Sequence, residues 1–198
     1  QINNYSCRRS RWVIEKIFGK IVTVGASAHR GTYIEHGIKH FFDRDKLAKG
    51  DLVADAVAYG VKEFDKKCKG MLKYEEERAN IEPCIRKGIE ELRKFKLMNF
   101  QLELHLDLNG YQVYGYSDFV FQGDVVSDRF VVDLKTTKRF PYKTNNQHCR
   151  QVSIYAKSLE CKGKIMYLVP KKSGIVDVQW IDIDDTEKYL KQAEEILK

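Results

Sequence analysis

Residues 111–135, YQVYGYSDFVFQGDVVSDRFVVDLK, contain the pattern from which the fold can be inferred. Aromatic and β-branched residues dominate 111–121 and 129–135, as they do in strands. The polar stretch QGDVVSD joins these two runs and is short enough to connect adjacent antiparallel strands. The sequence therefore predicts a β-hairpin in this region.

The expected hairpin brings two acids together. If its loop is centred between Val125 and Val126, Asp118 lies directly opposite Asp133. Opposed residues have Cβ atoms about 4.5–5.5 Å apart, where like charges are destabilising. Lys135 is two residues beyond Asp133 and projects from the same face. Two interpretations stay open: a divalent cation such as Mg²⁺ that offsets the repulsion, or a surface hairpin whose lysine pairs with an acid.

The segments on either side predict an α/β (α+β) protein. In the first half, apolar residues recur at steps of three and four, which indicates helices over 5–18, 29–43, 51–68 and 74–96. Leucines alternate with polar residues over 101–108, and Asn109-Gly110 follows, which predicts a strand and a two-residue hairpin turn. Further patterns predict helices over 145–160 and 184–197 and strands over 163–169 and 175–182.

We therefore expect one domain over 1–198 with a central mixed β-sheet flanked by helices. Its parts are a mainly helical segment 1–98, a sheet with the candidate site over 99–182, and a C-terminal helix 183–198.

Composition restricts the class of protein. The 198 residues include 35 Lys and Arg against 28 Asp and Glu, a formal net charge of +7, which favours a polyanionic partner. No run of about 18 apolar residues occurs, and the charged N-terminus is not typical of a signal peptide, so we expect no membrane partner. The five cysteines form no CxxC pair, which favours free thiols in a reducing compartment.

The segment after the hairpin combines a basic strip with a polar helix face. Gln151 and Tyr155 are four residues apart and share a face, where they either pack or contact a phosphate or base. Four basic residues precede or begin this helix, either as a surface for a charged substrate or as a solvated charge run: Lys138, Arg139, Lys143 and Arg150.

Four motifs, in order over roughly residues 6–170, resemble the PD-(D/E)XK nuclease superfamily and more narrowly its RecB-type branch. These are Gly31-Thr-Tyr-Ile-Glu-His36, Gly115-Tyr-Ser-Asp118, Asp133-Leu-Lys-Thr-Thr137 and Gln151-Val-Ser-Ile-Tyr155. The resemblance implies a restriction-endonuclease-like core.

The resemblance also implies roles for individual residues. Asp118, Asp133, the Leu134 carbonyl and His36 would bind Mg²⁺ or Mn²⁺, and Lys135 would be the catalytic lysine. Six residues would contact or position the substrate: Thr136, Thr137, Lys138, Arg139, Gln151 and Tyr155. Glu103 is a further candidate for the same site.

The resemblance implies a metal-dependent deoxyribonuclease, more specifically an exonuclease that acts on DNA ends or single strands. Such an enzyme would serve DNA processing, recombination or repair and would be encoded by a phage or mobile element. A specific endonuclease and a non-catalytic nucleic-acid-binding module are the alternatives. Some members of this branch hold an iron–sulfur cluster with one N-terminal cysteine and three near the C-terminus. We expect no such cluster here, because only Cys149 and Cys161 follow residue 140. The expected compartment is the cytoplasm, with the mitochondrial matrix as the alternative, and the expected partners besides DNA are further copies of the chain or a recombination protein.

Overall fold

The computed structural model describes residues 24–44, 51–123, 125, 128–142 and 145–197. The helix expected over 5–18, Cys7 and Lys143 lie outside these residues. The described chain is a mixed α/β protein, which confirms the predicted fold class. Its central sheet has the strand order β1-β4-β5-β6-β7, and β5 is parallel to β6 whereas the other pairs are antiparallel. The bounds are β1 Lys96–Phe100, β4 Phe119–Gln122, β5 Arg129–Thr136, β6 Lys162–Pro170 and β7 Val176–Asp182.

The register predicted for the hairpin is confirmed. Phe119 pairs with Val132 and Phe121 with Phe130, so the numbers of paired residues add up to 251 along β4 and β5. This register brings Asp118, just before β4, to the part of β5 that carries Asp133.

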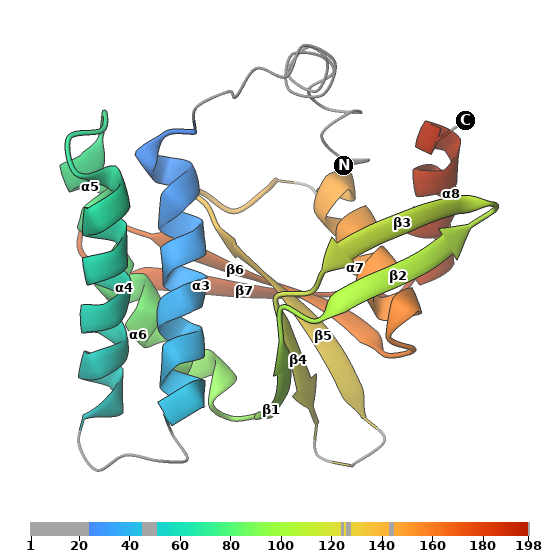
Figure 1. Cartoon of the computed structure of the whole chain (residues 1–198), viewed down its shortest axis with the longest axis horizontal. Helices are drawn as coiled ribbons and strands as arrows, with labels where there is room; N and C mark the ends of the chain where they lie inside the picture. The colour runs from blue at the N-terminus through green and yellow to red at the C-terminus, as the bar shows by residue number, and fades with distance from the viewer. Residues whose placement is uncertain (1–23, 45–50, 124, 126–127, 143–144, 198) are drawn as a thin grey trace.

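The strand expected over 111–121 is in fact two strands. Its first part, β3 (Tyr111–Tyr116), pairs with β2 (Glu103–Leu108) in a separate two-stranded sheet. Its second part is β4, which pairs with β1 on one side and with β5 on the other. The strands β1 and β2 follow one another in the chain but run in different directions. Because β3 pairs with β2 and β4 pairs with β1, the chain passes from one sheet to the other between β3 and β4 (Figure 1).

Backbone hydrogen bonds hold the crossing point of these strands. Ser117 N–H donates to the Leu102 carbonyl and Gln101 N–H donates to the Asp118 carbonyl, both over 3.0 Å. Gln101 has a φ of 47°, a left-handed conformation that turns the chain between β1 and β2. Asp118 is therefore fixed at the junction of the two sheets.

The predicted turn between β2 and β3 is also confirmed. Asn109 and Gly110 have φ values of 51° and 86°, as a two-residue type I′ turn requires. Leu104 and Leu108 are buried on one face of the hairpin, whereas His105 on the opposite face is exposed. The leucine alternation thus marks a strand with one buried face.

Helices cover both faces of the central sheet (Figure 1). Residues of α3, α4 and α6 pack against one face, and residues of α7 pack against the other. The sequence predicted one helix over 74–96, but α5 ends at Arg78, a new helix begins at Ile81 and it ends at Leu92. Pro83 explains the new start, because proline lacks an N–H and is tolerated only in the first turn. The helices are α3 Ala26–Arg44, α4 Leu52–Cys68, α5 Tyr74–Arg78, α6 Ile81–Leu92, α7 Asn146–Ser158 and α8 Thr186–Leu197.

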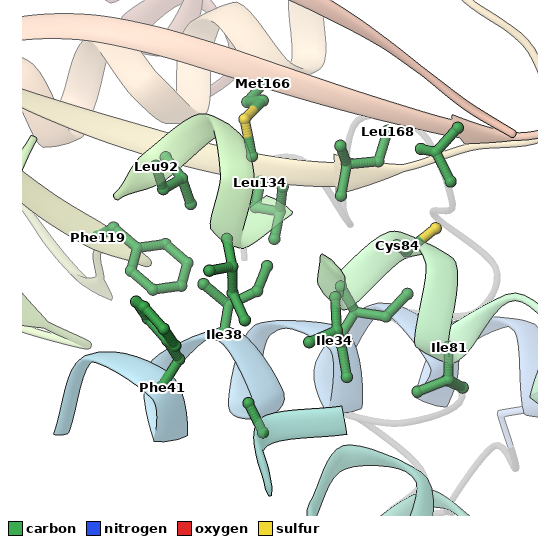
Figure 2. Packing of buried hydrophobic residues seen from close by; sticks show 14 of the residues in the cluster. Ile34, Ile38, Phe41, Ile81, Cys84, Leu92, Phe119, Leu134, Met166 and Leu168 are labelled. Carbon is green, nitrogen blue, oxygen red and sulfur yellow. The ribbon is translucent and has the colours of Figure 1, made fainter. Parts of the chain in front are cut away.

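The larger core fixes α3 against the sheet. Figure 2 shows Ile34 and Ile38 of α3 pointing toward Leu134 of β5, and all three are buried. The helices approach closely at Gly60, where an added Cβ would lie 2.5 Å from Ile85 Cδ1 and 3.0 Å from the Tyr33 carbonyl oxygen. This packing sets the height and rotation of α3 above β5. In the described part of the chain, no helix has the length and apolarity needed to cross a bilayer.

Candidate active site

Asp133 and Lys135 form a buried ion pair on the face of β5 that α7 covers. Asp133 has no exposed surface, and Lys135 Nζ lies 2.8 Å from both of its carboxylate oxygens. Only Oδ1 accepts a hydrogen bond with good geometry, and no described residue donates one to the buried Oδ2. Burial alone would lower the pKa of Lys135, but the negative charges of Asp133 and Asp118 outweigh it and raise that pKa above the usual range.

Asp118 joins this pair from the junction of the two sheets. Its Oδ2 accepts a hydrogen bond of 2.9 Å from the Leu134 N–H, so β5 itself fixes the carboxylate. Burial and the nearby charge of Asp133 raise the pKa of Asp118 from 3.8 to about 7. The juxtaposition that the register predicted therefore exists, with Asp133 fully buried and with Asp118 and Lys135 half-buried.

A third carboxylate, Glu35 of α3, belongs to the same cluster and was missed by the sequence analysis. Burial raises the pKa of Glu35 well above its usual range, the charges of Asp118 and Asp133 raise it further, and Lys135 opposes them. The only signal in the sequence is that Glu35 lies beside the buried stripe of α3, one residue after Ile34 and three before Ile38.

His36, the metal ligand that the resemblance implies, lies in different surroundings. Successive residues of a helix differ by about 100° in direction, so His36 and Glu35 face different neighbours. The His36 ring meets the Tyr33 ring edge-on at 5.8 Å and lines a pocket with Lys39. Burial, followed by the charge of Lys39, lowers the pKa of His36, and Glu63 opposes them. Of these two neighbouring residues, Glu35 is the one whose charge interacts with the acids in the described structure, and the metal-ligand role of His36 stays a prediction.

The polar face of α7 lies near the cluster, and Gln151 and Tyr155 share this face as their spacing predicted. Gln151 Nε2 donates a hydrogen bond of 2.6 Å to the Tyr155 hydroxyl. Burial, together with the charge of Asp133, raises the pKa of Tyr155 above the usual range. One turn earlier, His148 Nδ1 lies 2.7 Å from the Tyr167 hydroxyl, and burial and Lys135 lower its pKa. His148 is thus a second neighbour of the site that sequence analysis did not assign to it.

The expected substrate contacts beyond Lys135 separate into two groups. The Thr136 carbonyl accepts a hydrogen bond from Arg30, and Lys138 Nζ pairs with Glu76 at 2.7 Å. Thr137 and Arg139 instead line a pocket that also includes His148.

The remaining candidate acid, Glu103, lies on the exposed face of β2. Its Oε1 is 3.2 Å from His105 Nε2 on the same strand. The structure gives it no contact with the buried acids among the interactions of the described residues.

The donor chemistry of the cluster fits a hard divalent cation. In the described residues, no group of three or more His, Cys, Asp or Glu side chains is arranged to hold a metal ion. Mg²⁺, however, commonly takes only one or two carboxylates and completes its shell with waters and substrate phosphates. Asp118 and Asp133 offer such a pair, and the buried Asp133 Oδ2 accepts no hydrogen bond from the described residues although the Lys135 ammonium lies 2.8 Å away.

Comparison with known proteins adds little to this description. No family model and no curated protein matches the chain. A solved structure described as "Crystal structure of SSO0001" is similar over 85% of this chain and 86% of that chain, with 19% sequence identity and a TM-score of 0.40. The functional argument therefore comes from the site itself.

Proposed function

We propose that this protein is a divalent-metal-dependent nuclease that hydrolyses phosphodiester bonds in DNA and acts as an exonuclease. One observation carries the proposal: Asp118 and Asp133 come from two separate segments and meet beside Lys135, and Glu35 of α3 is near enough for its charge to interact with all three. Three acids and one lysine leave an excess of negative charge in a buried site. Groups with strongly shifted pKa values, as Glu35, Asp118 and Lys135 have, occur preferentially at functional sites. The motif resemblance to the PD-(D/E)XK superfamily supports the same conclusion.

Each group has a role that its position allows. Asp118 and Asp133 would bind Mg²⁺ or Mn²⁺, with the Leu134 carbonyl as a further oxygen donor, and Glu35 would add negative charge beside them. When bound, such a cation activates water and neutralises the charge that develops on a phosphoryl group. Lys135 stays protonated, so its ammonium group can donate hydrogen bonds to the attacking water or to a phosphoryl oxygen.

Residues of α7 would complete the site. The Gln151–Tyr155 hydrogen bond fixes the Tyr155 hydroxyl near the acids, where it can position a phosphate oxygen. The substrate is a polyanion, and the net charge of +7 favours its approach.

The proposal is tested by digestion of end-labelled DNA, single-stranded and double-stranded, with Mg²⁺ or Mn²⁺. We expect shortening from an end that EDTA abolishes. The Asp133→Asn variant should lose about 10³-fold in rate, because it removes a carboxylate that would hold the cation. Asp177→Asn is a matched control, since Asp177 forms only a surface pair with Lys171.

Two results would contradict this assignment. Undiminished cleavage by a folded Asp133→Asn variant would exclude the site, and no cleavage with either metal would exclude the activity. Covalently closed circular DNA should remain intact, whereas its linearisation would favour the endonuclease alternative.

A further inference from the structure

A second concavity lies directly beyond the carboxylate cluster, where β5 ends. It has a volume of about 510 Å³, which is within the range of ligand pockets. Thr137, two residues beyond Lys135, forms one side of it, and His148 of α7 forms another. The charges of Lys135 and Asp133 act on the pKa of His148, so the pocket and the cluster are neighbours. We call this concavity the Arg139 pocket.

Aromatic side chains form much of the wall of the Arg139 pocket. Phe140 and Tyr142 lie on the segment that follows β5, and Tyr167 lies on β6, paired in register with Lys135. Tyr142 is 99% exposed, so its ring is not needed for the core. Flat aromatic rings on a surface are suited to stacking with nucleobases, which contributes substantially to the binding of single strands.

The charge of the pocket suits a phosphate-bearing ligand. None of the described residues that line it is acidic, and no described acidic side chain forms an ion pair with the exposed guanidinium of Arg139. The neighbouring Lys138 differs, because Glu76 already pairs with its ammonium group. A guanidinium matches the geometry of a phosphate and can donate two hydrogen bonds to it.

His148 gives the pocket a fixed polar side. Its Nδ1 lies within hydrogen-bond distance of the buried Tyr167 hydroxyl, which restrains the ring. The Arg139 pocket thus combines stacking surfaces, a cation and an oriented imidazole next to three acids.

We infer that the Arg139 pocket binds an unpaired nucleotide of single-stranded DNA next to the phosphate that is hydrolysed at the carboxylate cluster. This inference rests on the proposed function and specifies its substrate class. Bases within a duplex are stacked on their neighbours and paired, so their faces are not available to Phe140 or Tyr142. Single-stranded ends should therefore be preferred over blunt duplex ends.

The test measures binding without cleavage. Fluorescence anisotropy in EDTA compares a labelled single-stranded oligothymidylate with a labelled duplex of the same length, using the full chain. Tyr142→Ala and Arg139→Ala should each weaken single-strand binding about five-fold or more and leave duplex binding nearly unchanged. Arg139→Ala should also reduce the dependence of single-strand affinity on salt, whereas Tyr142→Ala should not.

Matched controls exist on the same molecule. Arg129 is an exposed arginine at the opposite end of β5, and Tyr111 is an exposed tyrosine of the β2–β3 hairpin. Arg129→Ala and Tyr111→Ala should bind the single strand like the wild type. Circular dichroism should show that all four variants are folded, which is expected because all four side chains are exposed.

The outcomes separate this inference from the proposed function. Equal losses for single strand and duplex, or no loss in either pocket variant, would overturn the pocket assignment even if the protein cleaves DNA. A selective loss of single-strand binding would support the pocket even if no cleavage were found with Mg²⁺ or Mn²⁺, a result that would overturn the nuclease proposal alone.

Discussion

Two buried ion pairs flank the end of β5, and they differ in charge balance. Arg30 and Glu77 form the first, between α3 and α5, with side chains that are 5% and 0% exposed. Asp133 and Lys135 form the second, on the opposite face of the strand. The first pair has one charge of each sign, and Arg30 also donates a hydrogen bond of 3.2 Å to the Thr136 carbonyl. Its geometry fits a structural connection between the helices and the strand.

The second pair is surrounded by further acids. Burial and the charge of Asp133 raise the pKa of Asp118, and burial followed by the charges of Asp118 and Asp133 raises the pKa of Glu35. A raised pKa means that the folded protein disfavours the ionised form. Burial of an ion pair does not by itself indicate a functional site, whereas an excess of acids around such a pair does.

The largest effect is expected from breaking the balanced pair. Arg30→Met leaves the buried Glu77 carboxylate with only the exposed Lys138, whose Nζ lies 3.8 Å from Oε1, which should lower the free energy of unfolding by about 3 kcal/mol. Urea denaturation measures this loss. The double variant Arg30→Met/Glu77→Leu should be more stable than Arg30→Met, because it removes the stranded charge.

The matched control for this prediction is a surface pair. Glu82→Gln removes a partner of Arg86 on the exposed face of α6 and should leave the urea midpoint nearly unchanged. If Arg30→Met and Glu82→Gln lowered the free energy of unfolding equally, the buried pair would contribute no more to stability than a surface pair.

The next effect sharpens the contrast, because removing a charge from the unbalanced cluster should stabilise the protein. The folded-state pKa of Asp118 is about 7 against 3.8 in the unfolded chain, so its contribution to stability is present below about pH 4 and lost as the pH rises through 7. Asp118→Asn keeps an oxygen for the Leu134 N–H but carries no charge.

This variant should therefore be more stable than the wild type at pH 8, by on the order of 4 kcal/mol without a bound cation. Urea denaturation in EDTA at pH 4, 6 and 8 measures the difference. A constant difference across this range would show that Asp118 does not titrate as the cluster requires.

The smallest effect concerns two neighbouring residues of α3. Glu35→Gln should lower the rate of DNA cleavage about 100-fold, because it removes a charge from the cluster. His36→Gln should change the rate by less than about two-fold, since His36 lies beside Tyr33 and Lys39. Steady-state rates with Mg²⁺ measure both. The reverse order would restore His36 to the role that the motif resemblance implies.

The sequence predicts those features that depend on local periodicity. The register between β4 and β5 follows from the symmetry of one loop, and with it the approach of Asp118 to Asp133. The i,i+4 spacing likewise predicts the contact between Gln151 and Tyr155. These relations need only strand and helix geometry.

Other features depend on contacts between distant segments. The assignment of His36 in place of Glu35 differs by one residue, and only the packing of α3 on the sheet decides which of the two faces the acids. The partners of Arg30 and Lys138 lie 47 and 62 residues away in the sequence, in helix α5. No pattern within one element could identify them.

Calorimetric titration with Mn²⁺ tests most directly the central claim that the excess negative charge beside Lys135 is a cation site. We predict one Mn²⁺ per chain, with binding lost in Asp133→Asn and kept in Asp177→Asn. At pH 6 the heat should depend on the buffer, because Mn²⁺ must displace protons from acids whose pKa values are raised. The account would be contradicted by wild-type protein that binds no Mn²⁺ at millimolar concentration, or by Asp133→Asn protein that binds it as tightly as the wild type.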